Sequence, residues 1–574
     1  MVVASLTVTL LLGGANPRGV PLETPARIVS ELASRGYNAE RDAVTLLADA
    51  PDTDAALDRA LETLPDDALK LRSEHVRDAL ETDDSKRSLG DRSLSDPSRS
   101  EATASPDSDA TVDRDSPSTP ERSAGPTTDN TSVSTGEEQP QNQNTATTSP
   151  VETRGVRSSD SDRQTRGREI DPDRLSVEID GDMTGQSTGT GEYSDFVAVF
   201  RDRYERLSKQ LRGRVNHRPT DALESLPGNE DAAVVGMVSD IRSTASGHWL
   251  IELEDTNGTF PTLVMKDRPI ADLVSELLLD EVIAVEGTLA DDGGILFVDS
   301  LHFPDIPRTH EPSTADRPVK AALISDVHVG SQEFKADAWH RFADWLHTDD
   351  AEGVEYLLIA GDMVEGVGVY PDQDEELDVI DVYDQYERFS EYLKEVPGDM
   401  EIVMIPGNHD AVRLAEPQPA FDSELRQTMS AHDARFTSNP SLVTIEGVSV
   451  LMYHGVSLDE VIAELPDEKA SYDEPHKAMY QLLKKRHVAP QYGGHTRLAP
   501  ETRDYLIIDE VPDVFHAGHV HKLGYGKYHN VLTINSGCWQ AQTDFQKSVN
   551  IDPDAGFAPI VDLETLELTV RSFG

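Results

Sequence analysis

Motifs of aspartate, asparagine and histidine recur five times between residues 319 and 522, each directly after an apolar run typical of a buried strand. In chain order they are Asp-x-His, Gly-Asp, Gly-Asn-His-Asp, His and Gly-His-x-His. Taken singly, each has an ordinary explanation as a turn, a helix cap or a surface residue. Because ligand sites in such sheets lie beyond the carboxyl ends of the strands, the recurrence predicts one shared site. Its candidate residues are Asp326, His328, Asp362, Asn408, His409, Asp410, His454, His519 and His521.

The chemistry of these side chains points to metal ions. Carboxylate, amide and imidazole groups without thiolates favour borderline or hard divalent ions, so manganese is the expected metal, with iron and zinc as alternatives. Seven ligands are too many for one ion but suit two ions that share a carboxylate. Two ions about 3.5 to 4 Å apart can activate a water molecule and stabilise the attacking and leaving oxygens on phosphorus. The motifs therefore predict hydrolysis of a phosphoester by two divalent metal ions.

The segments that must hold these residues alternate between strand-like and helical patterns from Val319 onwards, which predicts an α/β domain over residues 311–574. Before it, residues 229–310 contain short strand-like runs separated by turn signals such as Asn257-Gly258, with the helical insert "IADLVSELLL". About five strands with such an insert suit an OB-type barrel. Aromatic residues are few in this segment, so a structural or subunit-docking barrel is favoured over direct nucleic-acid binding.

The first part of the chain predicts three further segments. Residues 22–80 contain short amphipathic stretches with N-cap signals, which indicate a small helical domain. Residues 81–190 are rich in Ser, Thr, Asp, Pro and Gln and poor in apolar residues, as in a disordered acidic linker. Residues 191–228 include a connecting helix from Tyr193. Residues 1–21 are interpreted as an extension from a start codon assigned too early.

The whole chain is strongly acidic, with a formal net charge of −55 at pH 7 and acidic residues in every segment. This indicates a halophilic source, because a highly charged surface keeps a protein soluble in molar salt, where repulsion is screened within about 3 Å. A nucleic-acid partner is not excluded, since metal ions and local basic patches can hold a phosphate backbone. A single cysteine and the lack of any apolar stretch long enough to cross a bilayer predict a cytoplasmic protein without a membrane partner.

The five motifs resemble those of the calcineurin-like metallophosphoesterase superfamily, and the resemblance spans about residues 318–574. It implies a β-sandwich flanked by helices. More narrowly, "GDMVEGVGVYP", "PGNHDAVRLAEPQP", "APQYGGHTRLAPE" and "HAGHVHKLGYGKYHNVLTINSGCWQAQTDFQ" resemble the small subunit of archaeal D-family DNA polymerases, as does the order of helical domain, barrel and α/β domain. That family implies a proofreading 3′–5′ exonuclease. It would assemble with a large catalytic subunit and act on DNA, especially single-stranded 3′ ends.

The resemblance also implies roles for matching positions. Asp362 would bridge two metal ions, and His409 would stay off the metals and donate a proton or a strong hydrogen bond to the leaving 3′ oxygen. Asp410 would orient a neighbouring group. Glu365 stands where related repair nucleases carry a histidine, and its carboxylate could support His409 by raising the pKa of that ring. The remaining ligands would be Asp326, His328 and His521 for one ion and Asn408, His454 and His519 for the other.

Four basic residues stand close together within this acidic sequence, namely Lys484, Lys485, Arg486 and Arg497. The ordinary interpretation is a solvated helix face followed by a loop. The alternative hypothesis is contact with a DNA backbone or the partner subunit, because repulsion elsewhere would make local positive charge necessary.

Two other functions remain open at this point. A non-catalytic scaffold could join the large subunit to other replication proteins, although the complete ligand set and His409 favour catalysis. A stand-alone repair nuclease or a small-molecule phosphodiesterase of the same superfamily is disfavoured by the order of segments. More than 300 residues precede Asp326 and 53 follow His521, whereas repair nucleases tend to begin with the phosphoesterase domain.

Overall fold

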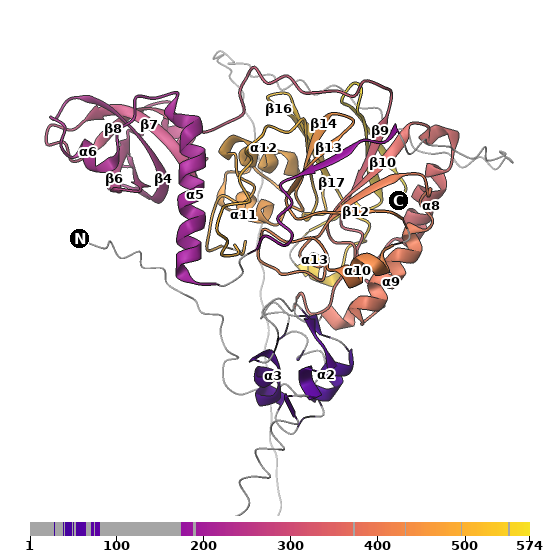
Figure 1. Ribbon diagram of the computed structural model, residues 1–574. Helices are drawn as coiled ribbons and strands as arrows, with labels where there is room; N and C mark the ends of the chain where they lie inside the picture. Colours follow the sequence, from indigo (N-terminus) through magenta and orange to yellow (C-terminus); the bar gives the residue numbers. More distant parts are fainter. Residues whose placement is uncertain are drawn as a thin grey trace, which may run out of the picture. The chain divides into compact units, whose positions relative to one another are not determined.

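The computed structural model describes scattered residues between Ile28 and Leu80, and then residues 174–187, 191–370, 373–430, 432–494, 496–548 and 551–574 (Figure 1). Two of the expected N-terminal helices are present as α2 (Arg41–Ala48) and α3 (Thr53–Glu62). A short parallel strand pair that the sequence did not predict, β1 (Asn38–Ala39) and β2 (Lys70–Leu71), accompanies them. Residues 1–21 and most of the predicted linker, 81–173, lie outside the described residues.

The C-terminal end of the predicted linker is ordered, which differs from the sequence expectation. Residues Val177–Asp180 form β3, which pairs antiparallel with β13 (Ser441–Ile445) at the edge of a sheet. Val177 and Ile179 pack against the core between the two sheets described below. Two alternating apolar residues are too short a signal to distinguish a strand from a linker.

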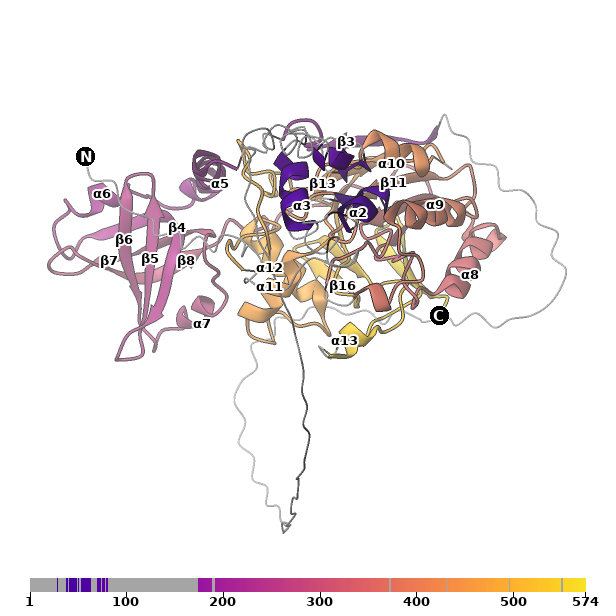
Figure 2. The same ribbon diagram turned by 90° about the horizontal axis from the view of Figure 1, so that it is seen from below.

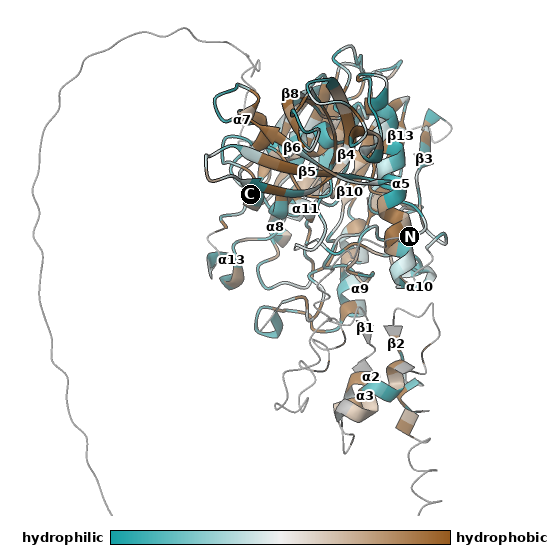
Figure 3. Ribbon diagram, turned by 90° about the vertical axis from the view of Figure 1, so that its left-hand side faces the viewer, coloured by the Kyte–Doolittle hydropathy of each residue, from teal (hydrophilic) through white to brown (hydrophobic). Residues whose placement is uncertain are grey.

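Residues 231–302 form the closed five-stranded barrel that the sequence predicted. Its strands are β4 (Asp231–Ser243), β5 (Trp249–Asp255), β6 (Gly258–Val264), β7 (Val282–Leu289) and β8 (Leu296–His302), in the order β4-β5-β6-β8-β7 (Figure 2). Alternate side chains fill the interior, so apolar and more polar residues follow one another along strands such as β5, as the colours of Figure 3 show. The short helix α7 (Ala271–Val274) lies within the predicted helical insert.

The predicted connecting helix is α5 (Tyr193–Arg212), and it is followed by the short α6 (Thr220–Leu223). Its buried face, including Tyr204, Leu207 and Leu211, packs against barrel residues such as Val235 and Ala284. These helix positions are spaced three and four residues apart, which is the spacing of one helix face. The apolar periodicity of the sequence therefore identified both the helix and its packed side.

The C-terminal part contains two six-stranded sheets packed face to face. The first has the order β12-β11-β10-β9-β18-β19 and the second β16-β17-β15-β14-β13-β3. In the first sheet β9, β10, β11 and β12 are parallel, and in the second β14, β15 and β17 are parallel. The strands are β9 (Lys320–Ile324), β10 (Val354–Ala360), β11 (Glu401–Ile405), β12 (Arg435–Phe436), β14 (Val448–Met452), β15 (Val514–Ala517), β16 (Leu523–Tyr528), β17 (Val531–Ser536), β18 (Phe557–Asp562) and β19 (Glu567–Ser572).

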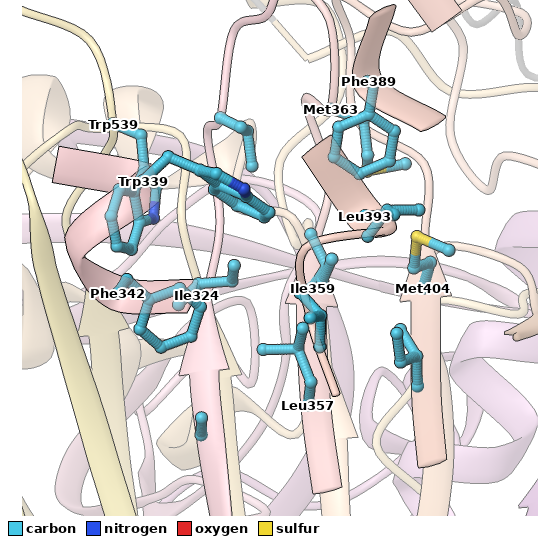
Figure 4. Packing of buried hydrophobic residues seen from close by; sticks show 14 of the residues in the cluster. Ile324, Trp339, Phe342, Leu357, Ile359, Met363, Phe389, Leu393, Met404 and Trp539 are labelled. Carbon is cyan, nitrogen blue, oxygen red and sulfur yellow. The ribbon is translucent and has the colours of Figure 1, made fainter. Parts of the chain in front are cut away.

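Helices cover the outer face of each sheet. Alternate residues of β9, β10 and β11, such as Ile324, Ile359 and Met404, pack against α8 (Ala336–Leu346) and α9 (Val382–Leu393) (Figure 4). The second sheet packs against α11 (Ser457–Glu464) and α12 (Pro475–Lys485). Shorter helices are α10 (Ser423–Thr428), α13 (Asp544–Ser548), η2 (Asp349–Ala351) and η3 (Gln373–Glu375). The architecture is a β-sandwich flanked by helices, and no described helix has the length and apolarity to cross a bilayer.

A buried ion pair connects α5 to the segment that precedes β15. Arg203 is fully buried, and its Nε donates to Asp504 Oδ2 at 2.7 Å, while His487 Nε2 lies 2.9 Å from the same oxygen. Burial acts to raise the pKa of the Asp504 carboxyl, but His487 and Arg203 bring it well below its usual range. Removing one partner of such a pair leaves an uncompensated buried charge.

Arg203→Met is therefore expected to lower the free energy of unfolding by about 3–5 kcal/mol. Because the folded pKa of Asp504 lies well below its unfolded value of about 3.9, the contribution is full above about pH 4 and is lost progressively as the pH falls from there towards the folded pKa. Urea denaturation in molar potassium chloride measures both effects, with Arg212→Met, exposed on the same helix, as the control. Equal stability of the two variants at pH 7 would contradict this account.

Candidate metal centre

Each of the five motifs directly follows a strand, as the sequence predicted. Asp326 and His328 follow β9, Asp362 follows β10, and Asn408 with His409 follows β11. His454 follows β14, and His519 with His521 follows β15. The first three strands are parallel neighbours in one sheet and the last two are parallel neighbours in the other. The motifs therefore meet where the carboxyl ends of both sheets come together.

One group of ligand atoms comprises Asp326, His328 and His521, all buried. The Nε2 atoms of His328 and His521 lie 3.0 Å apart. Asp326 Oδ1 lies 3.8 Å from His328 Nε2 and 3.4 Å from His521 Nε2. Two imidazole nitrogens and one carboxylate oxygen thus face a common point, which is the arrangement that a divalent ion requires of its ligands.

A second group of candidate ligands forms around Asp362. This carboxylate lies close to the first group as well. Asp362 Oδ2 is 3.2 Å from His454 Nε2 and 3.8 Å from His328 Nε2. Asn408 Oδ1 is 2.9 Å from His454 Nε2. The position of Asp362 next to both groups is that of a carboxylate shared by two ions.

His519 is placed differently from the other six candidate ligands. Its backbone N–H donates to both oxygens of Asp326, at 3.1 and 2.9 Å. Its ring contacts that of His454, but its Nε2 lies 3.0 Å from Asp459 Oδ2. The side chain is therefore held beside the second group, with Nε2 directed to a carboxylate and Nδ1 as the nitrogen left for a ligand role.

Five of these residues have backbone angles that side chains rarely adopt. The φ angles are 53° at Asp326, 56° at His328, 54° at Asp362, 71° at His519 and 54° at His521. Left-handed conformations of non-glycine residues cost of order 1–3 kcal/mol each and cluster at functional sites. Here they turn the chain sharply after β9, β10 and β15, so that the side chains point back to the centre.

The glycines within the motifs allow the strand ends to approach one another. A Cβ atom on Gly407 would lie 2.2 Å from Asp362 Oδ1, and one on Gly518 would lie 2.2 Å from Asp326 Oδ2. A Cβ on Gly361 would lie 2.4 Å from His454 Nδ1. These contacts explain the Gly-Asp, Gly-Asn and Gly-His pairs in the sequence, because any larger residue would displace a candidate ligand.

The orientation and charge of the imidazoles fit metal ions. His454 Nδ1 lies 2.8 Å from the carbonyl of Ala360, and His328 Nδ1 lies 2.9 Å from Glu365 Oε2. In both rings Nε2 is therefore the nitrogen that faces Asp362. Burial acts to lower the pKa of His454, but Asp362 more than offsets it and raises the pKa to about 10. Ionised carboxylates that stabilise a proton on the imidazole this strongly also attract a divalent cation.

His409 lies beside the two groups and has one ring nitrogen fixed by the backbone. Its Nδ1 is 2.7 Å from the carbonyl oxygen of Glu365, and its own N–H donates to Asp362 Oδ1 at 2.8 Å. The ring meets that of His328 edge to face, with centroids 4.8 Å apart. A proton held on Nδ1 by the carbonyl leaves Nε2 as the nitrogen available for proton transfer.

Asp410 is buried beneath the ligands. Its Oδ2 accepts hydrogen bonds from the backbone N–H groups of Asp362 and Gly407, both at 2.9 Å, and its Oδ1 accepts from the Tyr386 hydroxyl at 2.9 Å. Burial and the nearby Asp362 charge raise its pKa to about 7. The carboxyl ties the loop after β10 to the loop after β11, and its orienting role stays a prediction.

The Glu365 carboxylate contacts His328 directly and lies in one group with His409, whose support by Glu365 stays a prediction. Its Oε2 lies 2.9 Å from His328 Nδ1 and accepts from Gln540 Nε2 at 2.6 Å, while Oε1 accepts from the Tyr370 hydroxyl at 3.0 Å. Its backbone carbonyl contacts His409 Nδ1, and its carboxylate lies within 4.8 Å of a His409 ring nitrogen. The sequence placed Glu365 near the site but gave no information about which way its side chain turns.

The four basic residues do not form an exposed cluster, in contrast to the DNA-contact hypothesis. Lys484 Nζ contacts Glu276 Oε2 at 2.6 Å, and the buried Lys485 contacts Glu281 Oε2 at 3.1 Å. Arg486 donates to the backbone carbonyl of Ile508 at 2.8 Å and is also buried. Arg497 alone of the four is exposed. The two lysines are covered because α12 packs against the loop between α7 and β7 of the barrel, which carries Glu276 and Glu281. The spacing of residues in the sequence does not predict such a contact.

Several residues that hold the candidate ligands escaped sequence reasoning. The Asn439 side-chain oxygen accepts from His454 N–H at 2.9 Å, and the Gln546 amide lies 2.9 Å from His521 Nδ1. Asp459, which contacts His519, follows His454 by five residues and was the only one close to a motif. The others are separated from their partners in sequence, so no local spacing could have found them.

A family model for the B subunits of DNA polymerases alpha and epsilon matches residues 321–523, which include all five motifs. Over these residues, which hold the candidate metal centre, the chain is similar to the B subunits of DNA polymerases. The DNA polymerase II small subunit of Halobacterium salinarum is 63% identical over 555 residues, 96% of this chain and 100% of the relative. That of Archaeoglobus fulgidus is 43% identical over 396 residues, 68% of this chain and 79% of the relative. The chain belongs to the family of DNA polymerase II small subunits.

These matches confirm the predicted resemblance to the small subunit of the D-family polymerase, and the Halobacterium relative fits the halophilic source expected from composition. Among solved structures, an asparaginyl-tRNA synthetase from Pyrococcus horikoshii is 14% identical, with a TM-score of 0.14, and covers 15% of this chain and 23% of its own. A likeness this small carries no argument about function.

Proposed function

We propose that this chain is the 3′–5′ exonuclease subunit of a two-subunit replicative DNA polymerase and hydrolyses DNA with a metallophosphoesterase domain. The observation that carries the proposal is convergence: candidate ligands from five strand ends and His409 meet at one place between two sheets. Family membership supports the replicative setting, because a small subunit implies a large catalytic subunit as its partner. DNA is the polymer on which such an assembly acts.

Two divalent ions fit the donor set, and manganese is proposed, with iron or zinc as alternatives. When bound, they would supply positive charge that activates water and stabilises the developing charge on the phosphoryl oxygens. Asp362 would be shared by both ions. The other ligands of the first ion would be Asp326, His328 and His521. Those of the second would be Asn408, His454 and His519.

His409 would act on the leaving oxygen. Hydrolysis at the 3′ end breaks the bond between phosphorus and the 3′ oxygen of the penultimate nucleotide, and that oxygen must gain a proton as it leaves. His409 Nε2, with Nδ1 held by the Glu365 carbonyl, can donate this proton when the ring is charged. The products are a nucleoside 5′-monophosphate and a shortened strand with a new 3′ hydroxyl.

A purely structural subunit is less well supported. Five left-handed non-glycine residues at the ligand positions are destabilising, and a scaffold would gain nothing from them. The match over the whole length of a polymerase small subunit also argues against a stand-alone repair nuclease. Catalysis and a scaffolding role can coexist in one subunit.

The proposal is tested by incubating purified protein with single-stranded DNA labelled at either the 3′ or the 5′ end, in molar potassium chloride with manganese. The expected result is immediate release of the 3′ label as a mononucleotide and a descending ladder from the 5′-labelled strand. Chelation should stop both. No cleavage by the chain alone or with its large subunit would move the assignment to the scaffold.

Glu365 gives a second prediction within this function. Because its carboxylate contacts His328 Nδ1, it would fix the orientation of that ligand, and Glu365→Gln is expected to weaken binding of manganese by about 10–100-fold. Isothermal titration calorimetry measures the affinity directly and does not depend on activity. The matched control is Glu391→Gln, whose side chain is 71% exposed on α9. An affinity equal to that of the control would exclude this role for Glu365.

A further inference from the structure

Two aromatic rings form a stacked pair beside His409. Tyr370, in the segment after β10, lies 4.9 Å from Phe545 of α13, centroid to centroid, with an angle of 24° between the rings. The Tyr370 ring centroid is 6.3 Å from that of His409. The two residues are 175 positions apart in the sequence, so the fold brings them together at the rim of the candidate metal centre.

One carboxylate holds both members of the pair. Glu376 Oε2 accepts a hydrogen bond from the Tyr370 hydroxyl at 3.0 Å, and Oε1 accepts from the Phe545 backbone N–H at 3.2 Å. The Tyr370 hydroxyl is also 3.0 Å from Glu365 Oε1, next to His328. Burial and the two carboxylates raise the pKa of Tyr370, so its hydroxyl stays neutral. The pair is therefore a positioned surface rather than two mobile side chains.

Hydrophobic packing does not explain the outer ring. Phe545 is 44% exposed on the short helix α13, between the exposed Asp544 and the buried Gln546. Among the described residues, it belongs to none of the hydrophobic clusters that form the cores. A phenyl ring that is held in place, stacked on one side and open to solvent suits a flat ligand.

We propose that Tyr370 and Phe545 form a stacking platform for the terminal nucleobase of the strand whose phosphodiester lies at the metal centre. The inference rests on the proposed exonuclease function and specifies its substrate as an unpaired 3′ end, because a base can stack on a protein ring only after it leaves the duplex. The separations from His409 place the platform within reach of one terminal nucleotide.

The charge of the chain favours this mode of recognition. Glu365, Glu376 and Asp544 lie around the pair, and the net charge is −55, so phosphate groups are repelled. A base is uncharged, and stacking tolerates every sequence because every base has an aromatic face. Binding at the platform should therefore depend less on salt than phosphate contacts do.

The binding test uses the full chain without metal and an oligonucleotide that carries 2-aminopurine at its 3′ end, whose fluorescence falls on stacking. Phe545→Ala is expected to weaken binding about 5- to 150-fold, and Phe545→Trp to restore it. The matched control is Tyr193→Ala, an exposed aromatic residue on α5. Equal affinity of wild type and Phe545→Ala would overturn the platform.

The activity test uses manganese and two strands that differ only at the 3′ end, one with a normal terminal nucleotide and one with an abasic one. Phe545→Ala should raise KM for the normal end and leave the abasic end unchanged. An equal loss on both strands would assign Phe545 a structural role and reject the platform. If wild type cleaves neither strand but still quenches 2-aminopurine in a Phe545-dependent way, the platform stands and the exonuclease proposal fails.

Discussion

His409→Ala is expected to reduce the rate of the chemical step in DNA hydrolysis by about 10²–10⁴-fold, the range that a positioned general acid contributes. The variant should still bind two metal ions, because His409 lies beside the ligand groups and its ring is fixed by a backbone carbonyl. Single-turnover kinetics measures the chemical step, and elemental analysis measures the metal content. Together the two measurements distinguish a variant that lacks the proton donor from one that has lost its metal ions.

The control for this variant is His340→Ala, since His340 is about half exposed on α8 and pairs with Glu395 away from the site. Its rate should equal that of wild type. A His409→Ala protein that cleaves DNA at the wild-type rate would exclude the proton-donor role. Loss of metal together with activity would instead make His409 a ligand, contrary to the assignment made above.

Asp362→Asn is expected to abolish measurable hydrolysis and to reduce bound manganese to at most one ion per chain. The carboxylate lies next to both ligand groups, and the substitution removes its charge and replaces one of its two oxygens by an NH2 group, which cannot bind a metal ion. The backbone at this position is left-handed, a conformation that asparagine tolerates well, so the fold should survive. Elemental analysis measures the bound manganese, and circular dichroism measures whether the fold survives.

Exposed Asp349→Asn, in η2, removes the same charge outside the site and should leave metal content and activity unchanged. An Asp362→Asn protein that retains two ions and full activity would show that Asp362 is not shared between them. A protein that loses its fold would appear in the circular dichroism spectrum and would call for Asp362→Glu, which keeps the charge.

Local sequence patterns were sufficient for the parts of the site that depend on strand ends. Apolar runs followed by Asp, Asn or His placed Asp362 and Asn408 correctly after β10 and β11, because parallel strands bring their carboxyl ends to one edge. The barrel and α5 were also predictable, since apolar residues alternate along the barrel strands and recur every three to four residues along the helix.

Contacts between distant segments could not be predicted in this way. The Glu365 carboxylate contacts His328 and the His519 ring contacts Asp459, because side-chain rotamers depend on the packed surroundings. Lys485 resembles a surface cation in the sequence but is buried against Glu281, since α12 meets the barrel segment there. Such pairings arise from tertiary packing, and a single sequence carries no record of it.

The most direct test of the central claim is mass spectrometry of the products released from an unlabelled single-stranded DNA by the full chain with manganese in molar potassium chloride. The account predicts nucleoside 5′-monophosphates released one at a time in the order of the sequence read from its 3′ end, and release slowed by about 10²–10⁴-fold in His409→Ala. Nucleoside 3′-monophosphates, release from the 5′ end, or undiminished release by His409→Ala would contradict it.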